Sequence, residues 1–421
     1  TASFRTDGSS RYSEENKWGY FPSAALAYRL SEENFMQDIS FIDDLKLRIG
    51  YGETGSTAIS PYTTLNMLFT SQAVFGDESF TTYEPTDRLP NPLRWETTQQ
   101  TDVGVDLSLL DGKIYFVADY YVKNTKDLLN SVQLPRSLGY SYTIQNIGEV
   151  QNKGFEFLLD TRIIDREVKW NISSNISFNR NKVIELYDDQ DINAGNLNIT
   201  VLIDYLNLVR EGQPMNVFYG YQSDGFDEDG NYQYVDLDQS GDITSADRTY
   251  IGNPNPDFIF GFNSHLAYKN FDFDLFVQGS QGNDIFALGM VAQTIDFGMG
   301  LNTLKDVLYD HWTPENTSAQ YPKISTTTRP RISDSFVFDG SYIRLKNIQL
   351  GYNIPTEKLG IRFLQSGKVY ISAQNLLTLT KYPWQDPEIN SFGGPNSLKQ
   401  GIDHYSYPVA KTYTFGVKLD F

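Results

Sequence analysis

The 421-residue sequence contains no cysteine and only three histidines. Without cysteine there is no disulfide framework, no zinc–thiolate site and no cysteine nucleophile. Long hydrophobic runs are also missing: a helical membrane span needs about 18 consecutive apolar residues, and the longest mostly apolar stretch, Ile285–Ile295, is too short. Basic residues are scarce, 34 against 53 acidic ones, which gives a net charge of −19. This balance argues against a nucleic-acid partner, which requires a basic surface.

Aromatic residues, in contrast, make up 14% of the chain, and their clearest pattern is in the final segment, Lys411–Phe421. From Tyr413 on, every second residue is aromatic or aliphatic, and the residues between them are polar, charged or glycine. The apolar series is Tyr413, Phe415, Val417, Leu419 and Phe421. Because successive side chains of a β-strand point to opposite faces, the segment predicts a strand with one apolar and one polar face. A sandwich strand and a lipid-facing barrel strand both fit this segment alone.

The same two-residue alternation recurs about a dozen times along the chain, and no change in composition divides it into domains. The other segments that show it are Ala2–Phe4, Tyr20–Leu30, Leu45–Tyr51, Val103–Leu109, Ile114–Val122, Phe155–Ile163, Trp170–Phe178, Phe258–Tyr268, Phe271–Val277, Ser341–Asn353 and Lys368–Thr380. Their second faces carry Asn, Ser, Gln, Gly, Asp and Tyr rather than the rows of Lys and Glu expected on a solvated sandwich. The pattern therefore predicts an all-β fold, a transmembrane antiparallel β-barrel wall of about 12 strands.

The links between the predicted strands differ in length. Some are short, as at Leu110–Lys113, whereas others are long, as at Leu186–Asp257 and Phe286–Gly340. Bacterial barrels have short periplasmic turns and long external loops. Counting back from a periplasmic carboxy-terminus places every long link outside.

A series of short motifs runs in order along the whole chain. They are Arg5–Arg11, Trp18–Ser23, Leu45–Arg48 with Gly50–Gly55, Asn152–Glu156, Gly252–Asp257, Tyr342–Asn347, Ser372–Leu376 and Asp386–Glu388. In these motifs the chain resembles the SusC/RagA-type TonB-dependent transporters of Bacteroidota outer membranes. The resemblance implies a 22-stranded barrel with an internal plug, in which the motif Arg5–Arg11 lies near the middle. We therefore expect residues 1–421 to be the carboxy-terminal part, with the plug, the TonB box and the first strands missing from this chain.

The function that the resemblance implies is active import of a bulky nutrient, an oligosaccharide or an oligopeptide, across the bacterial outer membrane. The implied partners are a SusD-like surface lipoprotein, which acts as a lid, and the TonB complex, reached through the missing amino-terminal part. Outer-membrane lipid would surround the barrel. Such transporters often assemble as dimers of transporter–lipoprotein pairs.

One motif indicates ion chemistry independently of the family. In Asp236–Asp247, oxygen-bearing side chains occupy loop positions 1, 3 and 5, glycine position 6 and a carboxylate position 12, as in a calcium-binding loop. The candidate ligands are Asp236, Asp238, Ser240, Asp242 through its backbone carbonyl, and Asp247. The predicted role of Ca²⁺ is structural, because no histidine joins the group. An acidic external loop without metal is the alternative.

Candidate ligand contacts lie in the last long loop. Trp384, Tyr405 and Tyr407 could stack on sugars or pack against peptide side chains, or they could pack the loop onto the barrel.

Two other function classes fit less well. An outer-membrane hydrolase would need a serine activated by a histidine, and the sequence neighbours of His265 offer no activating partner. We therefore expect no enzyme. A passive porin is the second alternative, although porins lack the Gly252–Asp257 segment and need no lid.

Overall fold

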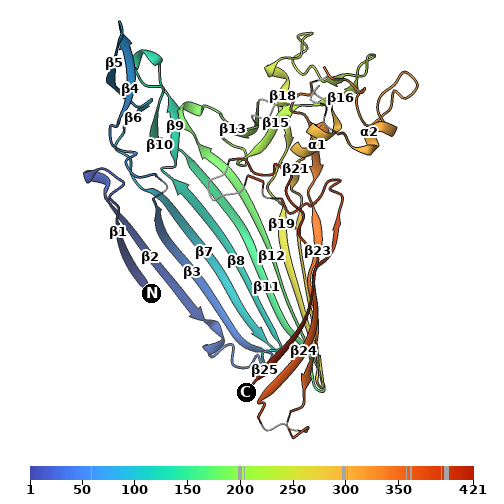
Figure 1. Cartoon of the computed structure of the whole chain (residues 1–421). Helices are drawn as coiled ribbons and strands as arrows, with labels where there is room; N and C mark the ends of the chain where they lie inside the picture. The colour runs from blue at the N-terminus through green and yellow to red at the C-terminus, as the bar shows by residue number, and fades with distance from the viewer. Residues whose placement is uncertain are drawn as a thin grey trace.

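The computed structural model of the chain describes residues 1–421 except 58, 198–201, 203, 296–299, 301, 328, 357, 361, 362, 390 and 393–397. Its main element is a 12-stranded sheet in which every strand pairs antiparallel with its neighbours in chain order (Figure 1). The strands are β1 Ala2–Gly8, β2 Trp18–Arg29, β3 Ile42–Ser56, β7 Glu96–Leu109, β8 Ile114–Lys126, β11 Glu149–Asp165, β12 Val168–Glu185, β19 Phe258–Tyr268, β20 Phe271–Gln281, β23 Tyr342–Ile354, β24 Ser366–Thr380 and β25 Thr412–Asp420. The predicted strands are thereby confirmed.

The register of the sheet gathers the alternating apolar residues on one side, called here the apolar face. One row of directly paired residues crosses six strands: Leu26, Ile49, Val103, Tyr120, Phe155 and Phe178. Many apolar-face side chains are open to the surroundings, and Phe415 on β25 is 74% exposed. Residues between them point to the opposite side, the polar face. A sheet that exposes its apolar side suits lipid, not water.

The two ends of the sheet differ, as the link lengths predict. The lower end in Figure 1 carries the short turns, for example 166–167 between β11 and β12. The last strand, β25, also ends there. The upper end carries all the long connections, which run over 57–95, 127–148, 186–257, 282–341 and 381–411. Among the described residues, no helix is long and apolar enough to cross a membrane.

The long connections contain their own secondary structure. The strands are β4 Leu68–Phe75, β5 Glu78–Pro85, β6 Arg88–Leu89, β9 Leu129–Gln133, β10 Tyr142–Asn146, β13 Ile192–Asn196, β14 Tyr205–Val209, β15 Val217–Tyr221, β16 Ser223–Phe226, β17 Tyr232–Tyr234, β18 Arg248–Gly252, β21 Asp284–Phe286 and β22 Val337–Asp339. The α-helices are α1 Leu288–Thr294 and α2 Lys305–Tyr309. The 3₁₀ turns are η1 Glu14–Asn16, η2 Leu30–Glu32, η3 Arg136–Leu138, η4 Tyr187–Asp189, η5 Ser245–Asp247 and η6 Asp334–Phe336.

Three long loops, 186–257, 282–341 and 381–411, share one hydrophobic core, and their described residues are called here the loop platform. The buried members are Leu197, Leu202, Leu206, Phe218, Phe286, Leu288, Val291, Ile295, Ile332, Phe336 and Ile402. Two parallel bridges join the loops, Tyr221 with Ser333 and Phe286 with Ile402. The platform is therefore packed like a water-soluble domain at the mouth of the sheet.

Candidate functional site

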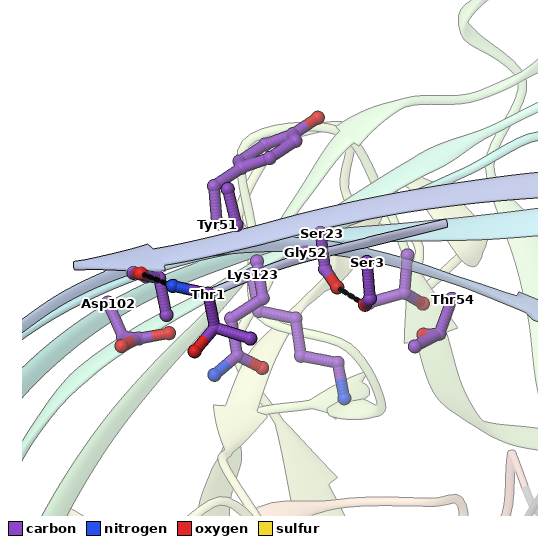
Figure 2. A pocket seen from close by; sticks show the side chains of 13 residues that line it. Thr1, Ser3, Ser23, Tyr51, Gly52, Thr54, Asp102 and Lys123 are labelled. Atoms are coloured by element: carbon purple, nitrogen blue, oxygen red, sulfur yellow. Dashed lines mark hydrogen bonds between the residues drawn. The ribbon is translucent and has the colours of Figure 1, made fainter. Parts of the chain in front are cut away.

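The polar face of the sheet offers hydrogen-bonding groups along its length. A hollow of about 380 Å³ next to β1 includes Ser3, Ser23, Asp102 and Lys123 in its lining. Figure 2 shows Asp102 and Lys123 on one side of the strands and the ring of Tyr51, an apolar-face residue, on the other. The side chains lie on opposite sides because successive residues of a β-strand point to opposite faces of the sheet. The polar face can therefore hold water or a polar ligand.

One hydrogen bond on this face crosses a whole strand. The Tyr121 hydroxyl on β8 donates to Asn179 Oδ1 on β12 at 3.0 Å, and the Asn179 amide donates to Asn152 Oδ1 at 3.1 Å. Gly154 on β11 lies between Tyr121 and Asn179 in the register. A Cβ at Gly154 would meet the Tyr121 hydroxyl at 2.9 Å and the Phe178 carbonyl oxygen at 1.9 Å. The glycine therefore leaves the space through which the two side chains meet.

Charged pairs on the same face tie adjacent strands together and also strands that have one strand between them. Arg48 on β3 reaches Asp106 on β7 at 2.8 Å and Asp119 on β8 at 3.0 Å. Lys368 on β24 lies 2.6 Å from Asp272 on β20. These pairs neutralise most of the charge that they bring to the polar face, which suits neutral polar ligands as well as water.

A buried arginine joins the sheet to the loop platform. Arg344 on β23 is 1% exposed; its Nη2 lies 2.5 Å from Asp386 and its Nη1 lies 2.8 Å from Glu388. Lys346 adds a second contact to Glu388 at 3.1 Å. A buried charge needs such partners, since an unpaired one is strongly destabilising. The last loop is thus fixed to the wall at this point.

The sequence contained the two halves of this cluster but not their contact. Tyr342–Asn347 and Asp386–Glu388 are separate motifs in the sequence. Their opposite charges are the only signal in the sequence that could have suggested the pair, since 42 residues separate Arg344 from Asp386.

The predicted metal ligands gather in part. The carboxylates of Asp236, Asp238 and Asp247 each offer an oxygen within 4.8 Å of the others. Ser240 lies beside them: its backbone N–H donates to Asp238 Oδ1 at 3.0 Å, and its hydroxyl donates to the Asp242 carbonyl at 3.0 Å. The carboxylate of Asp242 is outside this group. This is compatible with the prediction that Asp242 would bind the ion through its backbone carbonyl only. Three carboxylates and a hydroxyl are a donor set that fits Ca²⁺.

The Asp247 carboxylate holds the backbone of this loop together through hydrogen bonds. Its side chain is buried, and it accepts hydrogen bonds from the backbone N–H groups of Thr244 at 2.7 Å and Leu237 at 2.8 Å. The Thr244 N–H, with those of Asp238 and Leu237, holds the pKa of Asp247 below its usual value. Arg331 ties the loop to the platform, because its Nη1 donates to the Ile243 carbonyl at 2.9 Å.

The three aromatic candidates of the last loop have different surroundings. Trp384 is half-buried against the small cluster of Ile285, Ala287, Met290 and Tyr382. A Cβ on Gly289 of α1 would lie 3.3 Å from the Tyr405 ring and 3.4 Å from Trp384 Nε1, so both aromatics meet at α1. Tyr407 is 90% exposed. Trp384 therefore packs the loop, Tyr405 meets α1 but keeps 44% of its surface exposed, and Tyr407 is the freest of the three to meet a ligand.

The three histidines have other partners. His265 Nδ1 lies 2.6 Å from Asp274 on the polar face, and His311 Nδ1 lies 3.0 Å from the Val307 carbonyl. His404 stacks on Phe392 with ring centres 5.9 Å apart.

Comparison with known proteins adds to this geometry. A family model described as "TonB dependent receptor-like, beta-barrel" matches residues 1–376. TonB-dependent receptor P3 of Formosa agariphila is 38% identical over 441 residues, which cover 100% of this chain and 44% of that protein. TonB-dependent receptor SusC of Bacteroides thetaiotaomicron is 34% identical over 439 residues, which cover 100% of the chain and 42% of SusC. The chain thus spans about half the length of the curated relatives it matches.

A solved structure of similar fold is the RagAB peptide transporter. It matches with a TM-score of 0.85 at 24% identity, over 100% of this chain and 45% of the RagAB chain. Similarity at this level establishes the fold of the wall and of the long loops.

Proposed function

The chain belongs to the TonB-dependent receptor-like β-barrel family of the bacterial outer membrane, of the SusC/RagA type, and from this premise we propose that it takes part in active import of a bulky nutrient. It would form the carboxy-terminal part of the barrel wall. The observation that carries the proposal is the pairing of a 12-stranded membrane wall with a packed loop platform at one end. A passive pore needs the wall only, whereas capture of a large ligand needs a rigid external surface as well.

The proposed partners and the ligand would meet different parts of the receptor. A SusD-like surface lipoprotein would dock on the loop platform, and the inner-membrane TonB complex would supply the energy. The ligand would be an oligosaccharide or an oligopeptide. Amide and hydroxyl groups on the polar face, such as Asn152, Asn179 and Tyr121, can hydrogen-bond to either class.

Uptake measurements test this proposal. Cells with and without the full-length receptor would be given labelled oligopeptides in one arm and labelled oligosaccharides in the other. We expect receptor-dependent uptake in one arm, and we expect it to stop when a protonophore collapses the proton gradient. Uptake that continues without the gradient would identify a passive porin instead. Loss of uptake when the co-purifying lipoprotein is deleted would support the proposal that this lipoprotein acts as a lid.

We also propose that the Asp236–Asp247 loop holds a structural Ca²⁺. Bound there, the ion would neutralise the three converging carboxylates and stiffen the 186–257 loop. Titration of the full-length receptor with Ca²⁺, followed by calorimetry and by protease resistance of this loop, tests the site. Asp238→Asn should weaken Ca²⁺ binding. Asp229→Asn, which removes a carboxylate elsewhere in the same loop, should not. No heat of binding at millimolar Ca²⁺ would exclude the site.

A further inference from the structure

Four basic side chains gather at the long-loop end of the apolar face. They are Lys126 on β8, Lys153 on β11, and Arg180 and Lys182 on β12, and together they are called here the basic patch. The strand alternation assigns them to this face: Lys153 is two residues from Phe155, and Arg180 is two residues from Phe178. The neighbouring residues Asn152 and Asn179 point to the polar face, where they hydrogen-bond to each other.

The register brings the patch together across three adjacent strands. Lys153 pairs directly with Arg180, and the next pair on the same face is Gln151 with Lys182. Gln151 also pairs with Asn124, so Lys126 lies one step further along the same face. The basic groups are therefore neighbours, although the chain as a whole carries a net charge of −19.

Little within the described residues balances this charge. Arg180 lies 2.9 Å from Asp257. In the part of the chain that the structure describes, no hydrogen bond or ion pair engages the ammonium groups of Lys126, Lys153 or Lys182. Like charges placed directly opposite each other destabilise a strand pair. Lys153 opposite Arg180 is such a pair, and an external anion would reduce the repulsion that the Arg180–Asp257 ion pair leaves.

The position of the patch indicates which anion it meets. Tyr120, Phe155 and Phe178 are the last aromatic residues on the apolar face of β8, β11 and β12 before the basic patch, with the Tyr120 and Phe155 rings 4.8 Å apart. Aromatic rows of this kind mark the boundary between hydrocarbon and headgroups. Two strand residues span about 7 Å, so Lys153 and Arg180 lie just beyond that boundary. They are on the side of the long loops, which is the external leaflet.

We propose that the basic patch binds the phosphate groups of the phosphorylated glycolipid in the outer leaflet. The headgroup phosphates would lie against the wall at the level of Lys153 and Lys182, with the acyl chains along the apolar face below. Lysine and arginine beside a membrane bind anionic headgroups in this way. This lipid contact would hold the receptor at a fixed depth and stabilise the upper part of β8, β11 and β12.

A lipid-binding titration tests the proposal. The full-length receptor in a non-ionic detergent would be titrated with lipid A that carries its phosphates, and binding followed by tryptophan fluorescence. The test variant is Lys153→Gln/Lys182→Gln. The matched control is Lys269→Gln/Lys358→Gln, which removes two exposed lysines at the short-turn end. We expect the test variant to bind about 30-fold more weakly and the control to bind like the unaltered protein.

Two further arms separate the alternatives. Dephosphorylated lipid A should bind the unaltered receptor no better than phosphorylated lipid A binds the test variant. Equal binding of the two lipids, or equal affinity of the test and control variants, would overturn the proposal. So would a test variant that keeps its lipid affinity but loses a protein partner, because the patch would then be a protein interface. Heat-modifiability on a gel confirms that each variant is folded.

Discussion

In the loop platform Leu206 is fully buried, whereas on the apolar face of the wall Leu350 is 48% exposed. The same contrast holds for Phe218 and Phe286, which are fully buried in the platform, against Phe415 on β25, which is 74% exposed. The platform follows the rule of a protein in water, in which apolar side chains leave the solvent. The wall keeps its polar groups on the other side and turns apolar groups outward, because lipid is its solvent. One chain thus contains two folding environments, joined where Arg344 meets the last loop.

The largest effect is expected where the two regions join. Arg344→Ala should leave Asp386 buried without a counter-charge and destabilise the docking of the last loop by about 3–5 kcal/mol. Hydrogen exchange of residues 381–411 in the full-length receptor would report the loss. Lys346→Ala, at the half-buried neighbour that also contacts Glu388, should change exchange by much less. Equal effects of the two variants would mean that burial of the arginine is unimportant.

The same leucine-to-alanine change should act differently in the two regions. Leu206→Ala creates a cavity in the platform core and should cost about 3 kcal/mol. Leu350→Ala removes a group that lipid can replace, so we expect a cost of about 1 kcal/mol or less. Protease resistance of the loops and thermal unfolding of the barrel, measured for both variants, would separate the two. If Leu350→Ala proved the more damaging, the assignment of the apolar face to lipid would be wrong.

A smaller effect is expected from filling the space at Gly154. Gly154→Ala places a methyl group against the Phe178 carbonyl and the Tyr121 hydroxyl and should cost about 1–3 kcal/mol through overpacking. Gly52→Ala is the matched control on the same face, because its Cβ would meet Ser23 at an ordinary 3.4 Å. The loss of stability in each variant is measured as the change in the temperature at which the barrel unfolds, followed on a gel. The platform should be unaffected in either variant.

The smallest effect concerns pH and is confined to the acidic loop of the platform. Backbone N–H groups, that of Thr244 first, hold the pKa of Asp247 below its usual value in the folded loop. The stabilisation that they provide is therefore present at neutral pH and is lost as the pH falls below about 4. The protection of residues 236–247 against hydrogen exchange, measured in chelator relative to the intrinsic exchange rate at each pH, should fall on acidification in the unaltered receptor. In Asp247→Asn this fall should be absent, while the wall strands keep their protection in both proteins.

The wall could be predicted almost completely from the sequence, but the platform could not. In β25 the apolar residues alternate with polar ones because one face meets lipid and the other does not. In β14 the residues Leu206, Asn207, Leu208 and Val209 are all buried, so the strand has two covered faces and no alternation. Its pairing with β13 and β15 therefore has no period-2 signal in the sequence.

The candidate site divides in the same way. The sequence predicted the grouping of Asp236, Asp238 and Asp247, because one short loop contains all three and its glycine allows the turn. It left open whether Trp384 and Tyr405 pack the loop or meet a ligand, and it did not predict that both lie against α1 or that Arg344 meets Asp386. Those contacts join segments that are far apart along the chain, and no repeating pattern in the sequence indicates which segments meet.

The sequence by itself determined the strands, their two faces and the end at which the long loops lie. These properties are local: strand geometry repeats every two residues, and each face meets one solvent throughout. The tertiary structure decided which loops share a core, which charges are buried and which lysines become neighbours on the apolar face. The physical reason is that these contacts depend on register and on loop closure over tens of residues, which no single stretch of sequence encodes.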